Sequence, residues 1–245
     1  MHEVRRDADI HREDGGWFNA RWHFSFDRYR DPAQMGVGPL RVFNDDRLAS
    51  GAVWPMHPHA DIEGLTYVLE GTFEHADSLG NGGQLQPGGI QRMTLGSGAE
   101  HSERNGSASE PMRFLQFWIL PDTPGLEPSV EQRQFTREDR HGKLLQVVGK
   151  GGGDVVDVHQ DARVWISSLD PTNSVEHGFG DGRAGYLYLI EGEAQLGQAT
   201  TLSTGDAAKL FGPEDLALTA TAPTELIVIE VPEHFTPVGV WARSR

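Results

Sequence analysis

The sequence contains no cysteine among its 245 residues. This absence excludes disulfides, thiolate zinc sites and thiol redox switches. Long hydrophobic runs are absent too, since none approaches the roughly 20 apolar residues that a membrane-spanning helix needs. The N-terminal residues lack the apolar core of a signal peptide. We therefore expect a cytoplasmic protein that makes no contact with a membrane.

Basic residues are in the minority. The chain has 21 Lys and Arg against 36 Asp and Glu, which gives a formal net charge of −15 at pH 7. An acidic surface of this kind is repelled by phosphate groups, and no cluster of Lys and Arg stands out along the chain. We therefore expect no direct contact with nucleic acid.

Short runs rich in β-branched and aromatic residues make up most of the chain, and no stretch has a long helical period. Turn-forming Gly, Pro, Asn and Asp bound these runs, which is typical of strands. The predicted strands include 66–69, 114–119, 164–167, 186–190 and 226–231. The Asn81-Gly82 pair favours a tight hairpin turn, and 129–140 is compatible with a short helix or arm. The sequence predicts an all-β fold.

Three segments recur in the same order in the second half of the chain, which predicts two copies of one β-barrel. Residues 67–71 recur as 188–192, 85–89 as 202–206, and 114–119 as 226–231. The stretch 121–128 between the copies holds three Pro and one Gly, too many to lie within an element. We predict a metal-binding domain over residues 1–135 and a degenerate domain without metal over 136–245.

Two patterns place metal-capable side chains two residues apart, His57-Pro58-His59 and His101-Ser102-Glu103. On a strand, residues i and i+2 lie on the same face, so both members of each pair can reach one ion. Three imidazoles and one carboxylate leave coordination positions open, as a catalytic metal requires. The patterns indicate a mononuclear metal centre.

The residues around both patterns match known spacings. Residues 51–71 read G-x5-H-x-H-x3-E-x7-G, which is close to the first conserved motif of the cupins. Residues 98–105 read G-x2-H-x3-N, which resembles the second cupin motif. Together the two motifs are far more specific than either His pair alone.

Further segments narrow the match, and residues 17–121 as a whole resemble the pirin family of bicupins. The resemblance is carried by residues 21–26, 38–47, 74–81 and 91–94 in addition to the two motifs. It implies two tandem cupin (jelly-roll-like) β-barrels. It also implies that the carboxylate ligand comes from the second motif, so that the metal ligands are His57, His59, His101 and Glu103.

Pirin-like bacterial proteins are associated with opening the heterocycle of quercetin by O2. The resemblance thus implies a metal-dependent dioxygenase, a quercetinase, that takes a small aromatic substrate and O2. Glu103 would serve both as ligand and as catalytic base for the flavonol hydroxyl. The same resemblance covers metal-binding regulatory or partner-binding proteins without turnover, and another metal-dependent cupin chemistry stays open.

Imidazole and carboxylate suit several divalent transition ions. We expect Fe first, with Cu, Mn, Co, Ni or Zn as alternatives. We expect one such ion per chain and a monomeric protein.

The remaining candidate residues have simpler interpretations. Glu63 shares the parity of His57 and His59, so it is a fifth ligand or a carboxylate hydrogen-bonded nearby. The second copy retains only His177 near its first motif, which is too little to hold an ion. We expect His177, like His23, His75, His141 and His159, to be structural or at the surface, and Phe24, Phe26 and Phe43 to lie in the core.

Overall fold

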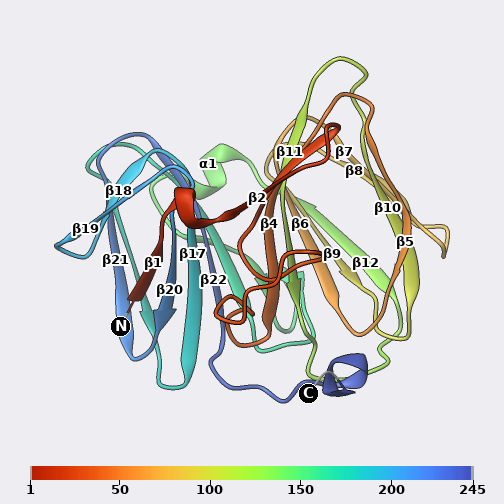
Figure 1. Cartoon of the computed structure of the whole chain (residues 1–245). Coiled ribbons are helices and arrows are strands. Elements are labelled where there is room, and N and C mark those ends of the chain that lie inside the picture. The colour runs from red at the N-terminus through yellow and green to blue at the C-terminus, as the bar shows by residue number, and fades with distance from the viewer. Residues whose placement is uncertain (1, 244–245) are drawn as a thin grey trace.

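The computed structural model describes residues 2–243, and β-strands account for nearly all of the regular structure in this range (Figure 1). Strand β10 (Ala99–Asn105) illustrates why, since its odd-numbered residues are buried and its even-numbered residues are exposed or partly exposed. This alternation matches the two faces of a strand that packs on a core through one side. The prediction of an all-β fold is confirmed.

The first half of the chain forms two sheets. The larger sheet has the strand order β12 (Ser129–Gln134), β9 (Gly89–Thr94), β6 (Glu63–Glu70), β11 (Met112–Ile119), β4 (Leu40–Leu48), β3 (Phe18–Trp22) and β2 (His11–Asp14). The smaller sheet has the order β5 (Val53–His59), β10, β7 (Phe73–Asp77) and β8 (Gly82–Leu85).

The second half repeats this plan, with one strand supplied by the N-terminus. Its larger sheet has the order β1 (His2–Arg5), β20 (Ala207–Phe211), β17 (Arg183–Glu191), β22 (Thr224–Pro232), β15 (Arg163–Leu169), β13 (Leu145–Gly149) and β14 (Val156–Asp157). Its smaller sheet has the order β16 (Ser174–Phe179), β21 (Glu214–Ala220), β18 (Glu193–Leu196) and β19 (Thr200–Ser203). The short helices are η1 (Asp7–Asp9), α1 (Arg137–Arg140) and η2 (Gly239–Arg243).

The four sheets stack in layers, with the two larger sheets back to back in the middle (Figure 1). The cluster between the larger sheets joins side chains of both halves, including Phe43, Tyr67, Tyr186 and Ile227, all at most 1% exposed. Each smaller sheet closes one side over its own apolar cluster. Buried apolar area is the main source of stability, so the two halves stabilise each other through this shared middle layer.

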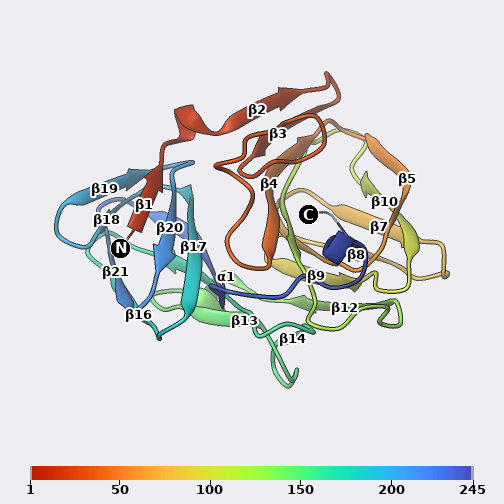
Figure 2. The ribbon, with the colours of Figure 1, turned by 60° about the horizontal axis from the view of Figure 1, so that its bottom comes forward.

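The predicted repeat is visible in the strand orders. The segments 67–71 and 188–192 end β6 and β17, which are third in their sheets, and 114–119 and 226–231 lie in β11 and β22, which are fourth. The ends of the chain cross between the halves, since β1 pairs with β20 and η2 lies against the first half (Figure 2). The division after residue 135 stays a prediction.

One local expectation was wrong and another is met in part. The hairpin between β7 and β8 is not a two-residue Asn-Gly turn, because the Asp77 carboxylate accepts hydrogen bonds from the backbone N–H groups of Leu79 and Asn81 and organises a four-residue loop, 78–81. The segment 129–140, expected to be a short helix or arm, is divided: residues 129–134 pair with β9 as the edge strand β12, and Arg137–Arg140 form a short helix. No helix within residues 2–243 is long and apolar enough to span a membrane.

Candidate functional site

Strands β5 and β10 of the smaller N-terminal sheet bring the predicted ligands together. β5 is an edge strand, which accommodates Pro55 and Pro58 because one side of the strand needs no N–H donor. His57 lies directly opposite His101 in the antiparallel ladder, and the register shifts between His101 and Glu103. The shift is an irregularity of the β-bulge kind, which re-aims side chains next to a site.

The three imidazole rings converge. Their centroids are 4.8 Å apart for His57 and His59, 4.5 Å for His57 and His101, and 5.2 Å for His59 and His101. One ring nitrogen of each lies within 4.8 Å of the others, and among the described residues this is the group of side chains that could hold a metal ion. The three histidines therefore have the spacing of ligands around one ion.

A hydrogen bond orients the ring of His57, and burial favours the neutral, coordinating form of His59 and His101. The Nδ1–H of His57 donates to the Pro55 carbonyl at 2.8 Å, which leaves Nε2 free to bind a metal. Both ring nitrogens of His101 are buried without a hydrogen-bond partner within residues 2–243. Burial and the neighbouring imidazoles lower the pKa of His59 to about 4 and that of His101 to about 3. Unprotonated imidazoles that lack partners fit a transition metal.

Glu103 lies beside the histidines rather than among them. One carboxylate oxygen is 3.6 Å from Nδ1 of His101, and the side chain is 9% exposed. Since His101 is neutral, the contact is not an ion pair. Burial raises the pKa of Glu103 to about 8. A buried carboxyl group without a cationic partner fits a site whose positive charge is supplied by a metal.

The inner chamber is a space of about 100 Å³ between β5, β10 and the larger sheet. Asn44 and Asp46 line it from β4, because alternate residues of this strand face the smaller sheet while Phe43 and Asp45 face the second half. One side-chain oxygen of Asn44 and one of Asp46 is buried without a hydrogen-bond partner among the described residues. Burial, together with Asp45 and Glu103, raises the pKa of Asp46 well above its usual value.

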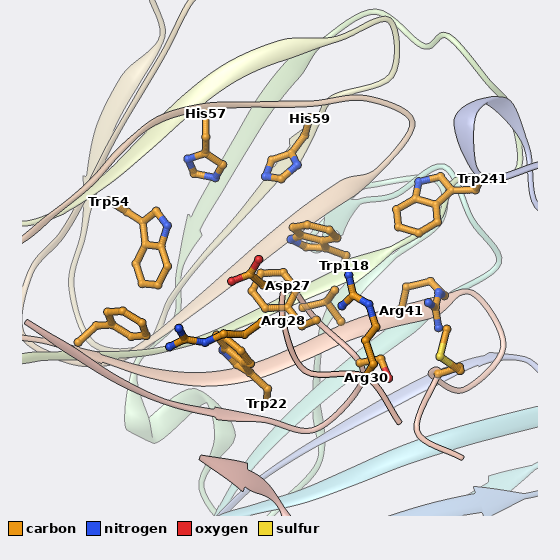
Figure 3. Close-up of a pocket in the computed structure, with 15 residues that line it drawn as sticks. Trp22, Asp27, Arg28, Arg30, Arg41, Trp54, His57, His59, Trp118 and Trp241 are labelled. Carbon is orange, nitrogen blue, oxygen red and sulfur yellow. The ribbon is translucent and has the colours of Figure 1, made fainter. Parts of the chain in front are cut away.

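The outer chamber opens from the inner one and has a volume of about 710 Å³ (Figure 3). His57, His59, Phe26, Trp54 and Trp118 line both chambers, so the two spaces adjoin at the histidines. Tryptophan rings form much of the outer wall: Trp22, Trp54, Trp118 and Trp241. No local sequence pattern predicts this space, because its wall comes from segments far apart in the chain.

The expectation that Phe24, Phe26 and Phe43 lie in the core was wrong for one of the three. Phe24 and Phe43 are fully buried in the middle layer. Phe26 instead contacts Trp22 and Trp118 edge-on in the chamber wall. Its segment leaves the sheet after β3, so strand periodicity does not apply to it.

Glu63 does not point toward the histidines. It begins β6 on the face of the larger sheet that meets the second half, and its oxygens accept hydrogen bonds from Thr94 at 3.0 Å and from the backbone N–H of His159 at 2.7 Å. The turn at 60–62 separates Glu63 from β5, so parity counted from His57 does not carry across it. Glu63 links the two halves of the molecule.

The other histidines have structural partners. His23 bonds the Tyr186 hydroxyl and His75 bonds Gln91, while His141 lies 3.4 Å from Asp170. In the second half, His177 lies opposite Leu216, so the paired strand offers no second imidazole there. Its Nε2 is 2.7 Å from the Glu230 carboxylate, which also accepts hydrogen bonds from Arg163 and Arg183, so His177 has a structural partner.

Comparisons with known proteins agree with this architecture. Residues 3–119 match the pirin family, and residues 146–231 match the family described as quercetinase C-terminal cupin domain. A quercetin 2,3-dioxygenase of Escherichia coli is 35% identical over 218 residues, which cover 89% of this chain and 93% of the relative. A pirin-like protein of Caulobacter vibrioides is 36% identical over 219 residues, with 89% and 94% covered.

Solved structures share this fold. The crystal structure of the bacterial pirin YhhW of Escherichia coli in complex with nickel(II) superposes with a TM-score of 0.89 at 33% identity, covering 97% of this chain and all of that one. Its bound nickel and the three converging histidines of the present chain indicate a divalent metal site. With its two stacked cupin domains and a relative 36% identical over most of its length, the chain belongs to the pirin family.

Proposed function

We propose that the protein is a metal-dependent dioxygenase that opens the heterocycle of a flavonol such as quercetin with O2. The observation that carries the proposal is the meeting of three converging imidazoles with a large aromatic chamber. A volume of about 710 Å³ lies within the range of roughly 300–1,000 Å³ typical of small-molecule sites. The E. coli relative named quercetin 2,3-dioxygenase supports this choice of reaction.

In this proposal, one divalent transition ion, with Fe as the first candidate, is held by His57, His59, His101 and Glu103. When bound, the ion supplies Lewis-acid and redox chemistry toward the flavonol oxygens and O2. Residues 1–135 carry this site, and residues 136–245 form a domain without metal that stabilises it. The protein acts as a cytoplasmic monomer.

The chain's own residues position the substrate and accept its proton. Trp54 and Trp118 flank the passage between the chambers, where flat aromatic rings stack favourably. The carboxylate of Glu103 in the inner chamber takes the proton of the flavonol hydroxyl.

The substitution Glu103→Gln tests the proposal, because Gln keeps the shape and an oxygen donor but cannot accept a proton. Metal-loaded wild-type protein should consume O2 when quercetin is added, and Glu103→Gln should lower the rate by about 10²- to 10⁴-fold while retaining some metal. Glu100→Gln is the matched control, since Glu100 is exposed on the same strand.

Two outcomes would contradict the proposal. If wild-type protein loaded in turn with Fe, Mn, Co, Ni and Cu shows no flavonol-dependent O2 uptake, the protein is not a flavonol dioxygenase. If Glu103→Gln and Glu100→Gln have equal rates, Glu103 is not the base.

A further inference from the structure

Two arginines in the outer chamber have no acidic partner. Arg41 of β4 is partly buried, and within residues 2–243 it forms neither a hydrogen bond nor an ion pair. Its guanidinium carbon lies 5.8 Å from the centroid of the Trp241 ring, a cation–π distance. Arg30 donates to the Tyr29 carbonyl at 3.0 Å and likewise forms no ion pair with any described residue.

A third arginine in the same chamber has an acidic partner. Arg28 forms two hydrogen bonds with the Glu13 carboxylate, with Nε to Oε2 at 2.8 Å. Asp27 is the one carboxylate in the chamber lining, and Glu233 lines a neighbouring hollow that Arg41 also borders. Neither acid lies within ion-pair distance of Arg30 or Arg41 among the described residues. The two cations are therefore uncompensated in a chain whose net charge is −15.

The unpaired arginines lie at the far end of the chamber from the histidines. In Figure 3, His57 and His59 occupy one end, while Arg30 and Arg41 lie below Trp118 and Trp241 at the other. Trp241 is held there by η2, where the Val240 N–H donates to the Asp61 carboxylate at 2.9 Å. The C-terminal turn thus fixes an aromatic ring over Arg41.

A partly buried guanidinium without a counter-charge is costly, and a ligand anion removes this cost when it binds. The planar guanidinium suits carboxylate, sulfonate and phosphate groups, which it binds with two parallel hydrogen bonds. The tryptophan rings around it suit a flat aromatic body.

We propose that Arg41, assisted by Arg30, binds an acidic group at the end of the substrate remote from the histidines, so that the preferred substrate is an anionic aromatic compound. This proposal rests on the function proposed above for its reacting end and adds the chemistry of the opposite end. Asp27 disfavours an anion near the middle of the chamber, which directs the acidic group to the arginines.

Metal-free protein tests the binding step separately from turnover. The probes are quercetin and quercetin-5′-sulfonate, whose added charge lies on the ring remote from the chelating oxygens, and the signal is quenching of tryptophan emission. Wild-type protein should bind the sulfonate about tenfold more tightly than quercetin, as expected for one charge-assisted contact. Arg41→Gln should abolish the preference, and Arg30→Gln should reduce it.

Arg47→Gln is the matched control, because it makes the same charge change on the same strand at a residue paired with Glu70 outside the chamber. It should leave the preference intact, and high salt should weaken the preference in the wild type. Equal binding of the two probes, or an Arg41→Gln preference like that of the wild type, overturns the proposal. If metal-loaded protein consumes no O2 with either probe but the binding preference is present, the dioxygenase function alone is contradicted.

Discussion

Tyr188→Phe is expected to weaken the contact between the two halves by a predictable amount. Tyr188, in β17 of the second half, donates its hydroxyl to Oδ2 of Asp45 in β4 at 2.6 Å. Arg113 donates to both oxygens of the same carboxylate, at 2.8 and 2.6 Å. Burial alone would raise the pKa of Asp45, but Arg113 and Tyr188 lower it below its usual value, so the carboxylate is charged.

The magnitude follows from the loss of one hydrogen bond to a buried charge, which costs about 1.5–3 kcal/mol. An unfolding entropy of about 2.1 cal/mol/K per residue gives about 0.5 kcal/mol/K for 245 residues. The melting temperature should therefore fall by about 3–6 °C. Scanning calorimetry or urea unfolding measures the change.

Tyr67→Phe provides the matched control. Tyr67 is the repeat counterpart of Tyr188, is 1% exposed in the same middle layer, and its hydroxyl makes no hydrogen bond with any described residue. Removing the Tyr67 hydroxyl should lower the free energy of unfolding by less than about 0.5 kcal/mol. If the two variants lose equal free energy of unfolding, the Tyr188–Asp45 hydrogen bond contributes nothing to stability beyond the packing of the ring.

Two further predictions concern the histidines. His57→Ala and His101→Ala should each lose most of the bound metal measured by elemental analysis, while exposed His141→Ala should keep it; unchanged metal content in the first two would exclude them as ligands. Burial lowers the pKa of His23 to about 3, so the folded protein keeps this ring neutral while the unfolded chain protonates it below pH 6.5. The folded state therefore loses stability as the pH falls from 6.5 toward 3. Between pH 6.5 and about pH 5, the free energy of unfolding of metal-free wild-type protein should fall by about 2 kcal/mol more than that of His23→Gln. An equal pH slope for the two proteins in urea titrations would count against this assignment.

Features that depend on residues close together in the chain could be predicted from the sequence. The pairs His57/His59 and His101/Glu103 could be recognised because a strand places i and i+2 on one face whatever it packs against. Turn residues and β-branched runs likewise indicated the strands of both halves. Local periodicity therefore predicted the all-β fold and the candidate ligand pairs, and the recurrence of three segments predicted the internal repeat.

Which surfaces meet depends on the tertiary packing of the sheets. Glu63 has the right parity, yet the turn before β6 carries it to the other face of the larger sheet, where it bonds His159. Asp45 and Asp46 are adjacent, but one contacts the second half and the other lines the inner chamber. Adjacent residues of a strand face opposite sides of the sheet, but the packing of the sheets decides what each side contacts.

The outer chamber is the clearest case. Arg41 and Trp241 are 200 positions apart in the sequence, and they meet because the segment after β22 returns from the second half and packs Phe235 and Trp241 against the first. No local pattern encodes such a contact, since it depends on the path of the backbone through all four sheets. Local sequence patterns are enough to predict the strands and the ligand pairs, whereas the packing of distant segments sets the shape and charge of the space in front of them.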